Sequence, residues 1–115
     1  MKFQWLDLMT LARDLAGTDH EAYRRAAISR AYYAVFHVGR RRWAQDQGLP
    51  TDRRIEHAPL WDYYRGRPGG AALGEKGRRL LELRRGADYD VAPAISARDT
   101  QRALNLAEEL LKALS

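Results

Sequence analysis

The sequence predicts an all-α, single-domain helical bundle of about five helices that spans residues 1–115. Apolar residues recur at the spacing of an α-helix in successive segments, and glycine and proline lie between these segments rather than inside them. A length of 115 residues and a hydrophobic fraction of 45% suit one packed core. Short loops between amphipathic helices favour a bundle over other all-α arrangements.

The first two helices are expected at residues 3–16 and 19–46. The first carries a regular apolar stripe and ends near Gly17, a common helix stop signal. Thr18 and Glu21 have the spacing of a capping box that opens the second helix. The long second helix ends before Gly48 and Pro50. The stripe of the first helix consists of Trp5, Leu8, Met9, Ala12 and Leu15.

Three shorter helices are expected in the second half of the chain. The third covers about residues 58–65, with Pro59 in its first turn. Residues 66–74 contain four glycines and one proline and predict a mobile loop. The fourth helix covers about residues 75–87, and Ser96 is expected to cap the fifth. The apolar stripe of the fifth helix consists of Ala103, Leu106, Ala107, Leu110, Leu111 and Leu114.

Composition excludes several classes of function. The chain has no cysteine, which rules out disulfides and thiolate chemistry and weakens any zinc-site interpretation. It has no apolar run of the roughly 18 residues that a membrane span needs. Acidic residues lie in the N-terminal segment where a signal peptide would be apolar. We therefore expect a cytoplasmic protein without a membrane partner.

The basic residues are mostly arginines, 17 against three lysines, and the net charge is +5. Arginine binds phosphate with two parallel hydrogen bonds and stacks on bases, so an RNA-binding surface is one interpretation. A coding bias toward arginine is the other. The cluster at residues 40–42, which includes Arg41 as a candidate substrate-binding residue, favours RNA slightly.

The segment 26–39 places Arg30 and His37 inside an apolar run. Seven helical steps return to within about 20° of the starting direction, so both side chains lie on one face, about 10 Å apart. The helix is apolar nearly all round at this point, which is typical of helices buried on every side. We expect a twofold homodimer to cover the face with the arginine and histidine. Close approach there would be allowed by Ala26, Ala27 and Ala34.

An arginine and a histidine fit metal-independent cleavage of RNA by its own 2′-hydroxyl. Histidine exchanges a proton near neutral pH, and arginine neutralises charge that grows on the phosphate. Two interpretations stay open at this stage. His37 is either this proton-transfer group or a hydrogen-bonded core residue. Arg30 is either a phosphate clamp or the partner of a carboxylate such as Asp88 or Asp90.

Three segments together resemble the HEPN superfamily of small prokaryotic helical domains, found in toxin–antitoxin and other defence systems. Residues 29–37 (SRAYYAVFH) are similar to its Arg-x6-His signature. Residues 56–61 (EHAPLW) and 80–90 (LLELRRGADYD) are similar to two further helices of one branch. The resemblance covers almost the whole chain. It implies a dimeric bundle with Arg30 and His37 as catalytic residues at the dimer cleft, ribonuclease activity, and no metal or cofactor.

The resemblance also suggests partners and supporting residues. Some family members act as toxins beside a nucleotidyltransferase antitoxin, and others only bind a partner or a nucleotide. This chain has Ala31 where active members often have a polar residue, and Gly39 where the toxin branch often has a modified tyrosine. A non-catalytic module that holds a nucleotidyltransferase or a nucleotide is therefore the alternative function. Candidate supporting residues are Tyr33, which shares the Arg30 face, His57, which supports the site or caps the third helix, and Asp88, which orients Arg30 or ends a turn.

Overall fold

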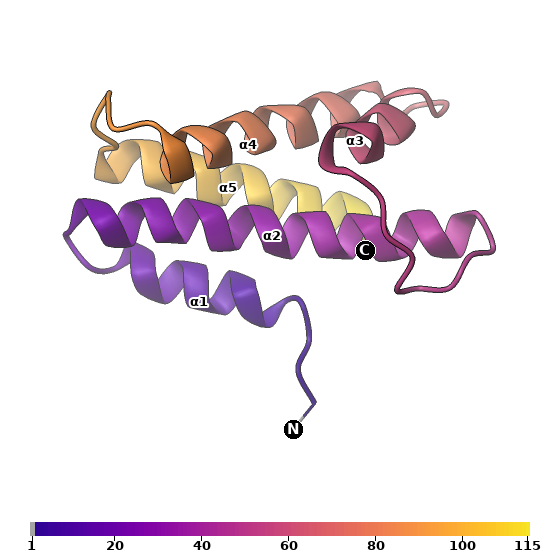
Figure 1. Ribbon diagram of the computed structural model, residues 1–115, viewed down its shortest axis with the longest axis horizontal. Coiled ribbons are helices and arrows are strands. Elements are labelled where there is room, and N and C mark those ends of the chain that lie inside the picture. The colour runs from indigo at the N-terminus through magenta and orange to yellow at the C-terminus, as the bar shows by residue number, and fades with distance from the viewer. Residues whose placement is uncertain (1) are drawn as a thin grey trace.

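The computed structural model describes residues 2–115, which form an all-helical bundle (Figure 1). Its helices are α1 (Asp7–Ala16), α2 (Glu21–Asp46), α3 (His57–Arg65), α4 (Ala71–Tyr89) and α5 (Ala97–Leu114). The described residues contain no strand. The predicted all-α fold class is therefore confirmed. None of the helices formed by residues 2–115 combines the length and the apolar character that a bilayer span requires.

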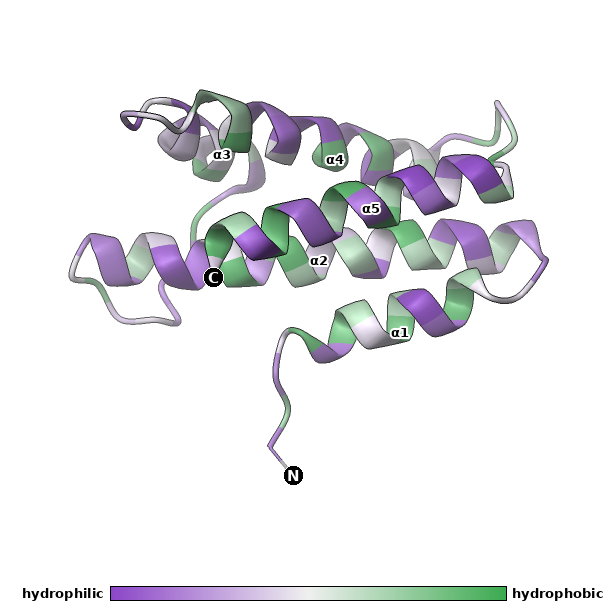
Figure 2. Cartoon of the chain, turned by 180° about the vertical axis from the view of Figure 1, so that it is seen from behind, coloured by the Kyte–Doolittle hydropathy of each residue, from purple (hydrophilic) through white to green (hydrophobic). Residues whose placement is uncertain are grey.

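Helix α2 is the central element of the bundle. It contacts each of the other four helices, and α3 packs mainly on α4 (Figure 1). Apolar residues line the sides of α1, α2 and α5 that face one another (Figure 2). The largest fully buried side chains of this core include Trp61, Tyr32, Tyr64, Met9, Leu60, Leu80, Leu81 and Leu110.

The beginnings of the first two helices differ from the sequence-based expectation. Helix α1 starts at Asp7, four residues later than predicted, so Trp5 precedes it and is no part of its stripe. The predicted Thr18 capping box is also wrong. His20 is the N-cap of α2, and its Nδ1 accepts a hydrogen bond from the backbone N–H of Ala22 at 3.1 Å. The predicted cap at Ser96 is confirmed, with a full capping box to Asp99.

The predicted loop over residues 66–74 is too long, because α4 already begins at Ala71. Two glycines of α4 serve close packing rather than a turn. A Cβ on Gly77 would lie 2.2 Å from Cε3 of Trp61, and one on Gly74 would lie 2.5 Å from the backbone N of Arg65. Helices α3 and α4 therefore approach each other at two positions where only glycine fits.

Two of the three small residues expected at a dimer interface are buried inside the single chain. Ala27 and Ala34 are fully buried within the single chain, so neither is available for contact with a second copy. Ala26 is half-buried, and Tyr23 on the same face of α2 is exposed. Helix α1 packs along α2 (Figure 1), so the helices of this one chain cover more of α2 than the sequence predicted.

Candidate functional site

His37 lies in the middle of α2 with its ring half-buried. The indole of Trp5 stacks on the imidazole with ring centroids 3.6 Å apart and planes 14° from parallel. Nδ1 is buried without a hydrogen-bond partner among the described residues. Burial, followed by the nearby charges of Arg40 and His57, lowers the pKa of His37 to about 4. At neutral pH the ring is therefore uncharged and able to accept a proton.

Arg30 is half-buried on the same helix, and within residues 2–115 it forms no ion pair with a carboxylate. Its Nη2 lies 3.4 Å from Oγ of Ser29, and its guanidinium lies 5.6 Å from the ring centroid of Tyr33. The pairing with Asp88 or Asp90 that the sequence left open does not occur. A guanidinium without a bound carboxylate keeps its hydrogen-bond donors available for a phosphate.

Asp88 instead joins two other residues of the site. Its Oδ2 accepts hydrogen bonds from Oγ of Ser29 at 3.3 Å and from Nη1 of Arg84 at 3.4 Å. Arg84 is buried, with 5% of its surface exposed, and its guanidinium lies over the rings of Tyr32, Tyr33 and Tyr89. Asp88 is therefore linked to Arg30 only through Ser29. The arginine that pairs directly with its carboxylate is Arg84.

His57 is the first residue of α3 and does not cap it, because Glu56 is the N-cap and provides no side-chain bond. The capping interpretation is therefore wrong. Nδ1 of His57 lies 2.8 Å from the hydroxyl of Tyr32, which also accepts a hydrogen bond from Nε1 of Trp61 at 3.2 Å. Burial and the nearby Arg84 lower the pKa of His57. The second histidine is thus fixed in place by the core.

His37 and His57 line one open pocket of about 380 Å³, which lies between α2 and the segment that leads into α3. Arg40 also lines it, and its Nη1 donates to the backbone oxygens of Thr51 and Arg53. Burial lowers the pKa of Arg40. The complete lining is Phe36, His37, Arg40, Asp52, Arg54, Ile55, Glu56 and His57.

The predicted site residues therefore fall into two groups that Tyr33 joins, since its ring centroid lies 6.2 Å from that of His37 and 5.9 Å from that of His57. The first is the shared pocket of His37 and His57. The second contains Arg30, Tyr33 and, through Ser29, Asp88. Arg41 is exposed and belongs to neither.

Sequence reasoning missed Trp5, Arg40 and Arg84 as neighbours of the site. The spacing of Arg84 and Asp88, four residues apart on one helix, was the available signal for one of them. Trp5 gives no such signal, because its spacing from Leu8 and Met9 fits the apolar stripe predicted for the first helix.

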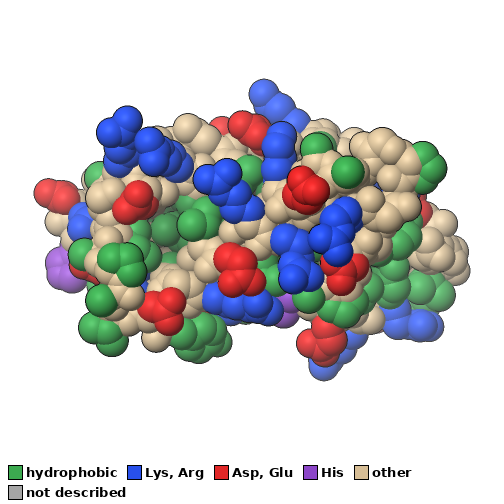
Figure 3. Space-filling view, turned by 90° about the horizontal axis from the view of Figure 1, so that it is seen from above, with side chains coloured by type: hydrophobic (Ala, Val, Ile, Leu, Met, Phe, Trp, Pro, Cys, Tyr) green, Lys and Arg blue, Asp and Glu red, His purple; other side chains and the backbone are tan. Residues whose placement is uncertain are grey.

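Charge on the surface is mixed where α3 and α4 are exposed. Figure 3 shows basic and acidic side chains interspersed over the molecule as seen from above. Asp62 pairs with Arg65 and Arg78, and Glu82 pairs with Arg85. These pairs neutralise much of the arginine on α3 and α4, so the excess positive charge is no argument for nucleic-acid binding on that side.

Residues 2–115 contain no group of three or more histidine, aspartate or glutamate side chains placed to hold a metal ion. What the site offers is one uncharged imidazole, one unpaired guanidinium on the same helix face and a second imidazole across a pocket. Comparison with known proteins adds nothing to this: no family model matches the chain, and neither does any curated protein or solved structure at the level of similarity required.

Proposed function

We propose that the chain is a metal-independent endoribonuclease of the HEPN type, with a toxin or defence role in the cytoplasm. It would act as a homodimer, with His37 as the proton-transfer group and Arg30 as the phosphate clamp. The observation that carries the proposal is the state of these two side chains. They share one face of α2, and within the described residues neither is paired with a carboxylate.

The reaction would be transesterification within the RNA. The imidazole of His37 takes the proton from a 2′-hydroxyl, the 2′-oxygen bonds to the adjacent phosphorus, and the bond from phosphorus to the 5′-oxygen breaks. The departing 5′-oxygen receives a proton, and Arg30 neutralises the charge that builds up on the phosphate oxygens. The first step needs His37 as the free base, which is its state at neutral pH, and the phosphate of bound RNA would raise its lowered pKa toward the range in which a general base works best.

A dimer would supply the remaining proton. The two side chains lie seven residues apart, about 10 Å along the helix axis, so one copy of each does not easily reach a single phosphate. A second copy would bring another Arg30 and His37 to the same RNA. Bound phosphate carries negative charge, which raises the pKa of a nearby imidazole and lets one histidine act as the acid. The exposed Tyr23 and the half-buried Tyr33 leave surface on this face of α2 for such a contact.

The test is cleavage of mixed RNA in the presence of EDTA by the wild type and by Arg30→Ala and His37→Gln. Removal of a positioned acid–base group typically costs about 10²–10⁴-fold in rate, and removal of one donor that stabilises transition-state charge costs about 10²–10³-fold; we expect losses of these sizes for His37→Gln and Arg30→Ala, respectively. Arg98→Ala is the matched control, because Arg98 is an exposed arginine in the first turn of α5. Circular dichroism and gel filtration would establish that all four proteins fold alike.

Three results would contradict the proposal. The first is cleavage that requires a divalent ion, and the second is cleavage that survives loss of His37. The third is the absence of cleavage by a folded, dimeric wild type.

A second candidate function has its own support. Ala31 is fully buried, so no polar side chain follows Arg30 in the site. Trp5 covers one face of His37 in the isolated chain. Both features suit a non-catalytic HEPN-type module that binds a nucleotidyltransferase partner or a nucleotide. Co-purification of such an enzyme with an inactive wild type would favour this alternative.

A further inference from the structure

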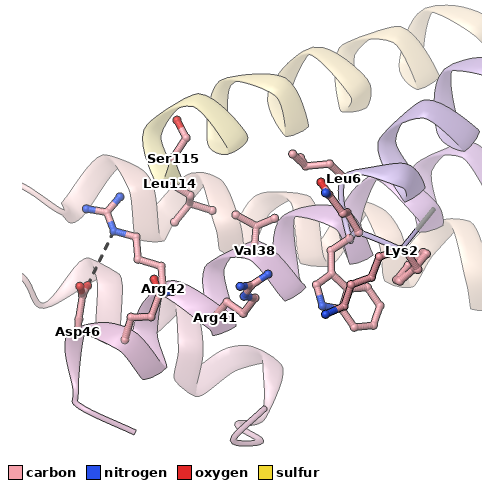
Figure 4. Close-up of a pocket in the computed structure, with 12 residues that line it drawn as sticks. Lys2, Leu6, Val38, Arg41, Arg42, Asp46, Leu114 and Ser115 are labelled. Carbon is pink, nitrogen blue, oxygen red and sulfur yellow. Dashed lines mark ion pairs between the residues drawn. The ribbon is translucent and has the colours of Figure 1, made fainter. Parts of the chain in front are cut away.

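Trp5 also lines a large pocket that contains neither Arg30 nor His37. It is an open cavity of about 690 Å³ between residues 2–6, the second half of α2 and the end of α5. Figure 4 shows Lys2 at one end and Asp46 at the other, with Val38 and Arg41 of α2 between them. Leu114 and Ser115 close it from the side of α5 (Figure 4). The cavity belongs neither to the pocket between His37 and His57 nor to the surroundings of Arg30.

The lining combines aromatic rings with positive charge. Phe3 and Trp5 both line the pocket, and their rings meet edge to face with centroids 5.1 Å apart. Phe3 is 57% exposed, which leaves much of its ring in contact with solvent. Aromatic rings beside a basic groove are the combination with which proteins bind single-stranded nucleic acid, since every base has a face that can stack.

The basic residues of the pocket are not all engaged. Arg42 pairs with Asp46 at 3.8 Å (Figure 4). It also donates to the backbone oxygen of Ala113. Arg41 is exposed, and within residues 2–115 it forms no ion pair and no hydrogen bond through its side chain. Lys2 adds a second positive charge, and among the described residues of the lining Asp46 is the only acidic one. The pocket therefore favours an anionic ligand with a flat, stacking part.

We propose that this pocket binds a nucleobase and the adjoining phosphate of single-stranded RNA, next to His37. Phe3 supplies the stacking surface and Arg41 binds the phosphate. The inference rests on the proposed function, because it takes RNA to be the substrate. It adds a place for a nucleotide that flanks the bond to be cleaved.

The position of the pocket relative to His37 supports this assignment. Trp5 is shared, since it lines the pocket and also stacks on the imidazole. Arg41 lies four residues after His37 on α2, which is about 6 Å along the axis. A nucleotide held by Arg41 and Phe3 would therefore lead the RNA backbone toward His37.

The experiment measures binding without cleavage. A fluorescently labelled single-stranded octamer of 2′-O-methyl RNA cannot be cleaved by this chemistry, because its 2′-oxygens carry no proton. Anisotropy titrations at fixed ionic strength would compare the wild type with Phe3→Leu and Arg41→Ala. Phe3→Leu keeps the apolar bulk and removes the ring, and Arg98→Ala controls for the loss of one exposed charge. We expect roughly 5- to 150-fold weaker binding for Phe3→Leu, the range for loss of one stacked base.

Arg41→Ala should also weaken binding, and its affinity should fall less steeply with salt than that of the wild type. Arg98→Ala should bind like the wild type. A duplex of the same RNA should bind much more weakly, because its bases are already stacked inside the helix.

Two outcomes would overturn the inference. One is equal affinity of Phe3→Leu and wild type for the single strand, and the other is equal affinity of the wild type for single strand and duplex. If either occurs while the wild type cleaves RNA in EDTA, the pocket assignment fails and the proposed function stands. If Phe3→Leu and Arg41→Ala both lose binding of the single strand while the wild type cleaves no RNA, the pocket assignment stands and the proposed ribonuclease activity is contradicted.

Discussion

Two tryptophans of this chain sit in contacts of opposite character. Trp61 of α3 is fully buried against Gly77 of α4, and its Nε1 donates to the hydroxyl of Tyr32, which is in turn bonded to His57. Trp5 stacks on His37, whose Nδ1 has no partner in the described chain, and a cavity of about 690 Å³ lies beside it.

The difference distinguishes a contact that stabilises the bundle, at Trp61, from a contact that leaves space for a ligand, at Trp5. A close-packed contact with satisfied hydrogen bonds tolerates little change, because moving its atoms or breaking its hydrogen bonds lowers the free energy of unfolding. An open contact with an unpaired polar atom gains less on folding, and in return it keeps a side chain and a surface available to a ligand. Stability should therefore respond strongly at Trp61 and weakly at the segment of residues 2–6.

The largest effect should come from Gly77→Ala. The new Cβ would lie 2.2 Å from a carbon of the Trp61 ring, so α3 and α4 must move apart. Overpacking of a core typically costs about 1–3 kcal/mol and sometimes more, and we expect a value of about 3 kcal/mol or above here. Urea denaturation monitored by circular dichroism would measure it.

Gly86→Ala is the matched control for Gly77→Ala. Gly86 lies in the same helix, and the nearest atom that its Cβ would meet is Oδ2 of Asp90 at 3.7 Å. Glycine inside a helix costs roughly 0.5–1 kcal/mol relative to alanine, so this variant should be slightly more stable than the wild type. Equal stability of the two alanine variants would show that the contact between Trp61 and α4 is not close-packed.

A smaller effect should appear at the Trp5 contact as pH falls. His37 has a pKa of about 4 in the fold, below the value of about 6.5 for a free histidine. The unfolded chain therefore takes up the proton first. The stabilisation is complete above pH 6.5 and is lost progressively as pH falls toward 4. The slope for one site is at most about 1.4 kcal/mol per pH unit, and a half-buried ring should give a fraction of it.

His37→Gln should reduce this loss of stability, which urea denaturation at pH 7 and pH 5 would show. Arg40 and His57 are the charged and titratable groups that lower the pKa of His37 alongside burial. His57 itself has a lowered pKa and adds a loss of the same sign, so the variant should keep part of the dependence. The carboxyl groups of Glu21 and Asp99 also have lowered pKa values, so they add a loss of the same sign as pH falls, and His37→Gln keeps that part as well. An unchanged pH dependence in His37→Gln would show that His37 is not held uncharged by the fold.

The bundle itself was predictable because its signals are local. Helical spacing of apolar residues identified the helices, and the spacing of Ser96 and Asp99 encodes the capping box of α5. The errors came from residues whose role depends on a distant partner. Gly74 was assigned by its sequence context to a loop, but it lies inside α4, where the close approach of Arg65 on another helix requires glycine.

The candidate site was also predictable only as far as its signals are local. Helix geometry placed Arg30 and His37 on one face, since a seven-residue spacing fixes direction. It did not show that Ser29 would bond to Asp88, or that the ring of Trp5 would cover His37. These contacts join residues that are 32 to 59 positions apart, as the pairs Trp5–His37 and Ser29–Asp88 show. No periodicity within one helix carries such information.

The smallest effect should come from Phe3→Leu. Phe3 is 57% exposed and touches one other ring, that of Trp5, so little apolar surface is lost when leucine replaces it. Exposed substitutions usually change stability by no more than about 0.5 kcal/mol, and the urea midpoint of this variant should match that of the wild type within that margin. A loss of 2 kcal/mol or more would mean that residues 2–6 hold the bundle together, and the contrast between the two tryptophan contacts would then collapse. An unchanged midpoint together with weaker binding of single-stranded RNA would separate the two roles, because the ring would then matter to the ligand and not to the fold.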